Sequence, residues 1–396
     1  MSAKPQQVSN APMAKSVQRV RPALSMSTVA TIQKTSKESP AALHFLAALN
    51  DCISATALPH PVTARNVDLL AAWQRWTAWQ EGALDGCSVA DRIVANTRNN
   101  FDMCVDLVKD ALRMDPVWTK NRSSATDEQQ LDTSAVFATA PLMYWRRPHA
   151  LIELTPVLEQ LLGNSDVGDD IPVGLLRAPL PACYIRFGAN MQCAVVPPHS
   201  EDHGRARVVG VYVFEAARDE QRALALVAIW AVDDQPTLSV STIDMIIKDE
   251  QERLVDVIKG ACGDQAGPVS GHHLFLAQLC TKVFLYWNVE QARQEKQAQY
   301  SDALIQLKRI GPKKAAKLRR QVAKLYDKIL LGPLSLTGSH GACVEVSPHW
   351  RRGHFRMQSH GPQHTLRKVL FIAPTLVRAD RLDDIGKESN RTGQRY

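Results

Sequence analysis

The sequence predicts an α+β protein with a helical N-terminal domain, a central antiparallel sheet with helices, and a basic C-terminal module. Apolar residues recur at helical spacing between residues 41 and 162. Short apolar runs separated by turn residues follow between residues 182 and 232, as is typical of an antiparallel meander. Lysine and arginine then concentrate after residue 300. Helical and strand-rich stretches that follow one another, instead of alternating, favour the α+β class.

These shifts in composition divide the chain into five segments. They are a disordered basic tail (1–40), a helical domain (41–165), an antiparallel sheet plus helices (170–300), a basic C-terminal module (301–381) and a flexible tail (382–396). The first segment is rich in Ser, Thr, Pro, Gln and Lys and has no acidic residue before Glu38, which predicts disorder. With 396 residues, the chain is long enough for two or three domains and a sizeable core.

Within the helical domain, the spacing predicts a helix that Thr63 caps and that ends near Gly82. Leu69, Trp73 and Trp76 fall at i, i+4 and i+7 on one apolar face. A peptide groove is an alternative use for such aromatic residues, but core packing is the commoner one. A second helix stops before Pro116. Its apolar stripe consists of Phe101, Val105, Val108 and Leu112.

Four strand-like runs come next, at residues 182–187, 192–196, 208–215 and 223–232. The last run is almost entirely apolar, which predicts a central strand covered on both faces. We expect helices at 243–259 and 272–297. One or two basic helices, broken at Gly311-Pro312, should then span 300–331, and a further strand-like run lies at 342–346.

The charge of the chain is distributed unevenly. Residues 301–381 contain sixteen Lys and Arg against four acidic residues, a net charge of +12, whereas residues 41–300 carry about −10. A basic third joined to a neutral or acidic body favours contact with a polyanion over a merely solvated surface. Part of the basic segment resembles half of a helix-hairpin-helix, which would present a helix N-terminus and lysines to a phosphate. Its candidate nucleic-acid-binding residues are Lys313, Lys314, Lys317, Arg319 and Arg320.

A second cluster of candidate residues lies between 349 and 356. Arginines, imidazoles and aromatic rings in one short loop are suited to binding RNA or phosphate. The candidate nucleic-acid-binding residues are Trp350, Arg351, Arg352, Phe355 and Arg356, although one of the two aromatic rings is expected to anchor the loop in the core. His349 and His354 are the catalytic candidates, since two imidazoles serve as base and acid in metal-independent RNA cleavage. They converge only if the loop turns sharply at Gly353, and we favour binding over catalysis.

The same cluster carries a family resemblance. Pro348, His349, Arg351 to Phe355, Gly361, the basic strand 366–372 and Pro374 resemble the C-terminal signature of an anti-CRISPR family active against type V-A systems. A weaker likeness extends from Ile171 to Phe187. The resemblance implies an inhibitor encoded by a phage or plasmid that suppresses biogenesis of the effector nuclease. In that family, action is thought to begin at the nascent N-terminal peptide of the target and to end in loss of its mRNA.

These observations together predict an inhibitor in the cytoplasm of a bacterial host. Its expected partners are the nascent N-terminal peptide of a CRISPR effector nuclease and RNA or the ribosome. We expect no cofactor and no metal site, and no apolar run is long enough to span a membrane. No phosphate-binding glycine loop or nucleophile elbow is present. Two alternatives remain: a non-catalytic DNA-binding or plasmid-maintenance protein, and a direct metal-independent endoribonuclease.

Overall fold

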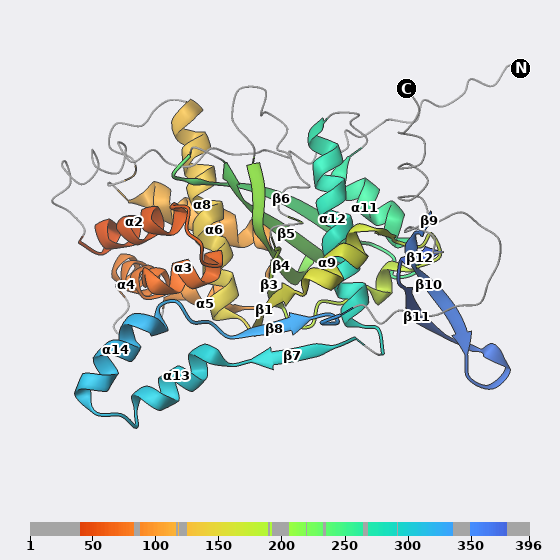
Figure 1. Cartoon of the computed structure of the whole chain (residues 1–396). Helices are drawn as coiled ribbons and strands as arrows, with labels where there is room; N and C mark the ends of the chain where they lie inside the picture. Colours follow the sequence, from red (N-terminus) through yellow and green to blue (C-terminus); the bar gives the residue numbers. More distant parts are fainter. Residues whose placement is uncertain are drawn as a thin grey trace, which may run out of the picture.

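The structure, a computed structural model, confirms the α+β class (Figure 1). It describes residues 40–82, 88–115, 118, 125–188, 191, 206–218, 220–232, 235–263, 268–290, 292–335 and 349–377. Both predicted tails lie outside the described residues, except for residue 40. The strand-like runs predicted at 192–196 and 342–346 also lie outside them.

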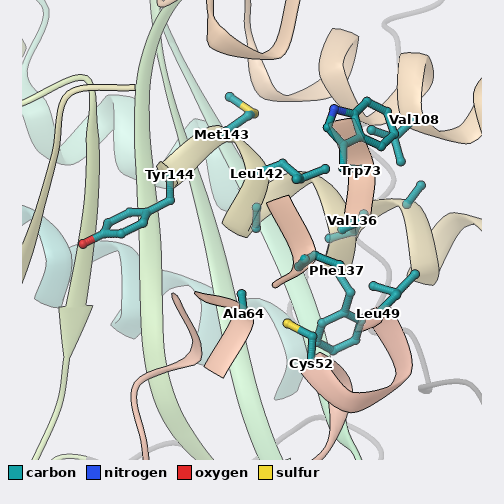
Figure 2. Close-up of a cluster of buried hydrophobic side chains, with 14 of the residues drawn as sticks. Leu49, Cys52, Ala64, Trp73, Val108, Val136, Phe137, Leu142, Met143 and Tyr144 are labelled. Carbon is teal, nitrogen blue, oxygen red and sulfur yellow. The ribbon is translucent and has the colours of Figure 1, made fainter. Parts of the chain in front are cut away.

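Helices flank a sheet on both faces (Figure 1). On one face lie α2 (Pro40–Ile53), α3 (His60–Asn66), α4 (Leu69–Glu81), α5 (Val89–Ala95), α6 (Phe101–Met114) and α8 (Ala125–Arg146). On the other lie α9 (Pro156–Gly163), α11 (Leu254–Cys262) and α12 (Pro268–Trp287). Figure 2 shows part of the first interface, where Trp73, Val108 and Phe137 from three helices join one apolar cluster.

The central sheet has seven strands in the order β6-β5-β4-β3-β1-β8-β7. Their bounds are β1 His149–Leu154, β3 Ala182–Arg186, β4 Ala206–Arg218, β5 Gln221–Val232, β6 Leu238–Ile247, β7 Gln294–Gln297 and β8 Lys328–Leu331. The meander from β3 through β4 to β5 is antiparallel, as predicted, and β6 adds a further antiparallel strand that was not predicted. The whole sheet is mixed, however, because β1 pairs in parallel with both β3 and β8.

Strand β5 is covered on both faces, as its apolar sequence predicts. Val227 and Ile229 join the cluster beneath α2–α8, whereas Leu226 and Ala228 join the cluster beneath α9–α12. Successive side chains of a strand point to opposite faces, so a strand between two helical layers needs apolar residues at nearly every position.

The two expected N-terminal helices are present as α4 and α6. Trp73 and Trp76 are fully buried, which confirms core packing, whereas Trp79 is 54% exposed. Gly82 ends α4 with φ +65°, a conformation that glycine adopts without strain. The predicted cap was wrong: Thr63 lies within α3, and Asp68 precedes the first residue of α4.

The expected helix at 243–259 was wrong in its first part. Ile243, Met245 and Ile247 are buried at alternate positions of β6, and α11 begins only at Leu254. Apolar residues with a period of two form a strand when a neighbouring strand can pair with them, and β5 supplies that partner. The expected helix at 272–297 likewise ends at Trp287, before β7.

The basic segment forms two helices, α13 (Gln299–Leu307) and α14 (Pro312–Val322), with the predicted break at Gly311-Pro312. Residues 328–331 then form β8 instead of continuing a helix. Strands β1, β7 and β8 come from the three predicted central segments of the chain, yet they are adjacent in one sheet. The expected segment boundaries therefore do not coincide with breaks in the sheet.

Candidate functional site

The cluster at 349–356 is divided between two small sheets. Strand β9 (His349–Arg351) pairs with β12 (Thr375–Val377), whereas β10 (Gly353–His360) pairs with β11 (Leu366–Ile372) and with β2 (Ser165–Asp166). A Cβ atom at Gly353 would lie 2.5 Å from Pro374 Cδ and 2.5 Å from Ser165 Oγ. Glycine is therefore needed here for close packing, not for the sharp turn that the sequence suggested. His349 and His354 lie in different sheets.

Phe355 anchors the β10–β11 hairpin in the core. Its ring is fully buried and lies 4.7 Å from the ring of Phe371, which in turn contacts Tyr286 of α12. A buried ring offers no face to a nucleobase, so Phe355 is not suited to the stacking role expected of it. The side chains of His349, Trp350 and Arg351 lie outside the described part of the structure.

The cations of this hairpin do not form one free surface. Arg352 pairs with Asp166 at 3.1 Å, and Lys368 pairs with Glu290 at 2.7 Å. Lys368 also holds the pKa of Glu290 below its usual value. Arg356 is exposed and lies opposite Leu370 in the ladder. The hairpin and the residue before it carry four cations with described side chains: Arg352, Arg356, Arg367 and Lys368. Two of them, Arg352 and Lys368, are thus already paired with carboxylates of the body.

The other candidate cations lie on a separate unit, residues 299–327, which we call the arm. The arm comprises α13 and α14 and leaves the sheet between β7 and β8. Lys317, Arg319 and Arg320 are exposed, and the side chains of Lys313 and Lys314 lie outside the described part. Figure 1 shows α14 and the β10–β11 hairpin at opposite ends of the view. The structure therefore separates the two sets of predicted nucleic-acid-binding residues.

A cavity of about 540 Å³ lies where the arm meets the body, and the sequence analysis did not find it. Its lining comes from α3, the end of α8, β1, the β7–β8 pair and the start of α13. The lining residues are Pro61, Val62, Arg65, Tyr144, Trp145, His149, Ala150, Leu151, Leu180, Lys296, Gln297, Ala298, Tyr300, Ser301, Tyr326, Asp327, Lys328 and Ile329.

Aromatic rings form the body side of the cavity. The ring of His149 lies 4.5 Å from that of Tyr144 and 4.9 Å from that of Trp145. Trp145 donates from its indole nitrogen to Pro61 O at 2.8 Å, which fixes the orientation of the ring. His149 Nδ1 donates to Arg147 O at 2.8 Å, so Nε2 is the ring nitrogen that this contact leaves free. Figure 2 shows the Tyr144 ring directed toward the strands, away from Trp73.

Arg65 joins the two sides of the cavity. Its guanidinium lies 3.8 Å from the centre of the Tyr300 ring and donates to Leu325 O at 2.9 Å. Asp327 accepts the backbone N–H groups of Tyr300 and Ser301 and so satisfies the first turn of α13. The residues that hold the root of the arm are thus also residues that line the cavity.

A charged cluster at Glu153 fixes the strand next to the cavity. Tyr326 donates to Glu153 at 2.6 Å, Arg186 donates at 3.0 Å, and Lys328 forms an ion pair with the same carboxylate. Burial would raise the pKa of Glu153, but the three donors outweigh it and lower that pKa overall. The cluster connects β1, β3 and β8, and two of its members, Tyr326 and Lys328, line the cavity.

A buried Cys52–His60–Tyr212 chain has the residue types of a nucleophilic site, but its electrostatics are wrong for one. His60 Nδ1 lies 2.7 Å from the Tyr212 hydroxyl, and Nε2 lies 3.5 Å from Cys52 Sγ. Burial lowers the pKa of His60 to about 4 and raises the pKa of the Cys52 thiol far above neutrality. Both groups are therefore neutral, whereas an activated cysteine needs a thiolate.

Asp244 gives a testable pH dependence. Burial, followed by the nearby Asp102, raises the pKa of Asp244 from 3.8 to about 7. Because the pKa of Asp244 is higher in the folded state than in the unfolded state, the folded state binds a proton more tightly at this carboxyl. The stability that this proton contributes is complete below about pH 4 and is lost as the pH rises through 7.

Asp244→Asn removes the titration. We expect thermal unfolding to show that D244N gains more in Tm over the unsubstituted protein at pH 8 than at pH 5, because at pH 5 the contribution is only partly lost. Equal differences in Tm at the two pH values would contradict this assignment.

In the part of the chain that the structure describes, no three His, Cys, Asp or Glu side chains gather so as to hold a metal ion. None of the described helices combines the length and the apolar character needed to cross a membrane. The cavity beside the arm combines aromatic walls with oriented polar groups, which is the chemistry of a binding site.

Comparison with known proteins places the chain in a family. Residues 152–379 match the AcrVA2-like family model, described as the anti-CRISPR type V subtype A2 family. No curated protein and no solved structure matches the chain. The matched range runs from β1 to just beyond β12 and includes the arm, the β10–β11 hairpin and the part of the cavity that β7, β8 and α13 contribute. Because the match covers more than half of the 396 residues, the chain belongs to the anti-CRISPR type V subtype A2 family.

Proposed function

We propose that this protein recognises the N-terminal peptide of a CRISPR effector nuclease as it leaves the ribosome and lowers the nuclease's mRNA. The basic C-terminal module contacts RNA or the ribosome during this process, in the cytoplasm of the bacterial host. The observation that carries the proposal, beyond family membership, is the cavity between body and arm.

The cavity has the size and the lining of a peptide site. Binding pockets for small ligands or side chains enclose roughly 300–1,000 Å³ and combine apolar walls with a few oriented polar groups. Here Tyr144, Trp145 and Tyr300 supply aromatic walls, while His149 Nε2 and the Arg65 guanidinium supply polar groups. The exposed residues Lys296 and Ala298 lie at its solvent side, so an extended peptide has access from outside.

The charge distribution supports the contact with RNA. The arm carries eight Lys and Arg against two acidic residues, whereas residues 41–300 are net acidic. A peptide site on an acidic body next to a basic unit suits a protein that acts where a nascent chain and RNA occur together.

The test is co-purification of the protein from a translating bacterial lysate, followed by sequencing of the attached mRNAs. We expect enrichment of the 5′ region of one reading frame, that of the effector nuclease, and loss of the enrichment with puromycin, which releases nascent chains. Enrichment that survives puromycin would contradict recognition of a nascent peptide. Binding to duplex DNA alone would favour the plasmid-maintenance alternative instead.

His354→Ala separates binding from cleavage in the same assay. We expect an unchanged decay of the target mRNA, since His354 lies on β10 in a sheet separate from that of His349. A lost decay with retained peptide binding, together with cleavage of naked RNA by the purified protein, would favour the endoribonuclease alternative.

A further inference from the structure

We propose that the outward face of α14 is the surface that contacts nucleic acid, and that its partner is double-helical RNA held through its phosphates. This inference rests on the proposed function and specifies which of the two basic surfaces acts and on what class of RNA.

The register of α14 places its cations on one face. Ala315 is buried and Leu318 and Val322 are half-buried, at i, i+3 and i+7 on the inner side. Lys317 and Arg320 are exposed on the opposite side, and Lys324 continues the same row in the turn after the helix. At a rise of about 1.5 Å per residue, the three residues are spaced at roughly 4.5 to 6 Å along the axis. They therefore form a straight row of positive charge.

This row is free to bind a ligand. Within the described residues, no carboxylate lies within ion-pair distance of Lys317, Arg320 or Lys324. Of the two acidic residues in the arm, Asp327 is already engaged by the backbone of α13. A row of unpaired cations costs free energy through mutual repulsion, which a polyanion relieves.

The β10–β11 hairpin lacks such a row. Arg352 and Lys368 are paired with Asp166 and Glu290. Arg367 lies opposite Ser359, which is three positions from Arg356 on β10, so the side chains of Arg356 and Arg367 point to opposite faces of the ribbon. The hairpin thus offers single charges where α14 offers an aligned set.

The chemistry of the row favours a duplex over a single strand. Proteins that bind single strands stack bases on aromatic side chains, and the exposed face of α14 has none. A rigid row of cations instead suits the regular phosphates of a double helix. The major groove of A-form RNA is too narrow for side chains to read, so we expect contact along the backbone and little dependence on sequence.

The position of the row connects it to the cavity. Arg65 and Asn66 of the body hold the arm through Leu325 O at 2.9 Å and Ala323 O at 2.6 Å. Tyr300 and Tyr326 of the arm line the cavity. A peptide in the cavity and an RNA helix on α14 can therefore be held by one fixed unit at the same time.

The experiment measures binding of the full chain to a short RNA duplex by fluorescence anisotropy over a salt titration. The test variant is K317Q/R320Q/K324Q, and the matched control R356Q/R367Q/K368Q removes the same charge from the hairpin. We expect the test variant to bind at least tenfold more weakly and to lower the slope of log K against log salt by about 2 to 3, since each duplex phosphate contact contributes about 0.9. The control should stay within twofold of the unsubstituted protein.

Three outcomes would overturn the inference. A loss confined to the hairpin variant would move the contact to β10–β11 and leave the proposed function standing. Equal affinity for a single strand of the same sequence would exclude the duplex as the preferred partner. No binding of either RNA by the unsubstituted protein would remove the RNA contact from the proposed function as well, while peptide recognition would still be tested by co-purification. Circular dichroism of both variants would test whether each one is folded.

Discussion

Replacing Ala298 by Trp should weaken peptide binding and reduce the loss of the effector mRNA. Ala298 is exposed, immediately precedes the first turn of α13 and lines the cavity. An indole at this position would occupy space that the proposed peptide needs. Overfilling a packed site costs about 1–3 kcal/mol, which corresponds to an affinity weaker by roughly 5- to 150-fold. Isothermal titration with a synthetic peptide of the nuclease N-terminus, and mRNA quantification in cells, would measure the two effects.

Ala298→Ser is the matched control, because it changes the same position by one small polar atom. We expect it to bind the peptide like the unsubstituted protein. Since residue 298 is exposed, A298W should unfold at a temperature close to that of A298S. If A298W binds the peptide normally, the peptide site lies elsewhere on the molecule and the cavity has another use.

Phe355→Ala should cause the largest loss of stability in the C-terminal part of the chain. The ring is fully buried and contacts Phe371, and the other links from the hairpin to the body include the short β2 strand, the Phe371–Tyr286 contact and the Lys368–Glu290 ion pair. Truncating a buried phenylalanine to alanine costs about 3–5 kcal/mol, through lost transfer free energy and the cavity left behind. Urea unfolding followed by tryptophan fluorescence would measure the change in the free energy of unfolding.

Phe355→Leu serves as the comparison, since it preserves most of the apolar volume and should cost less than half as much. A change below about 1 kcal/mol in F355A would mean that the ring is not packed in the core. It would then be available to stack on a base, as the sequence alone suggested.

The parts of the fold that the sequence predicted correctly are those with strong local patterns. The stripe from Phe101 to Leu112 forms α6, and the apolar run at 223–232 forms a strand covered on both faces. The break at Gly311-Pro312 separates two helices because proline suits the first position of a helix and not its interior. In each case, neighbouring residues contain enough information to select the structure.

The errors concern strands that a local pattern does not distinguish from helices. Strands β1 and β8 were each placed in or next to a helix, yet they pair with one another across 170 or more residues of sequence. Strand β6 was placed in a helix because Ile243, Ile246 and Ile247 also fit a helical face. Short apolar segments fit either structure, and the adjacent strand decides between them.

The amino-acid order alone determined the α+β class, the excess of positive charge after residue 300 and the motif near Gly353 by which the family is recognised, because these are properties of composition and of neighbouring residues. Only the tertiary structure decided which cations share a free face, that Phe355 lies inside, and that Arg65, Tyr144 and Tyr300 surround one cavity. These last features join residues far apart in the chain, and their positions are set by the packing of helices and strands around a common core.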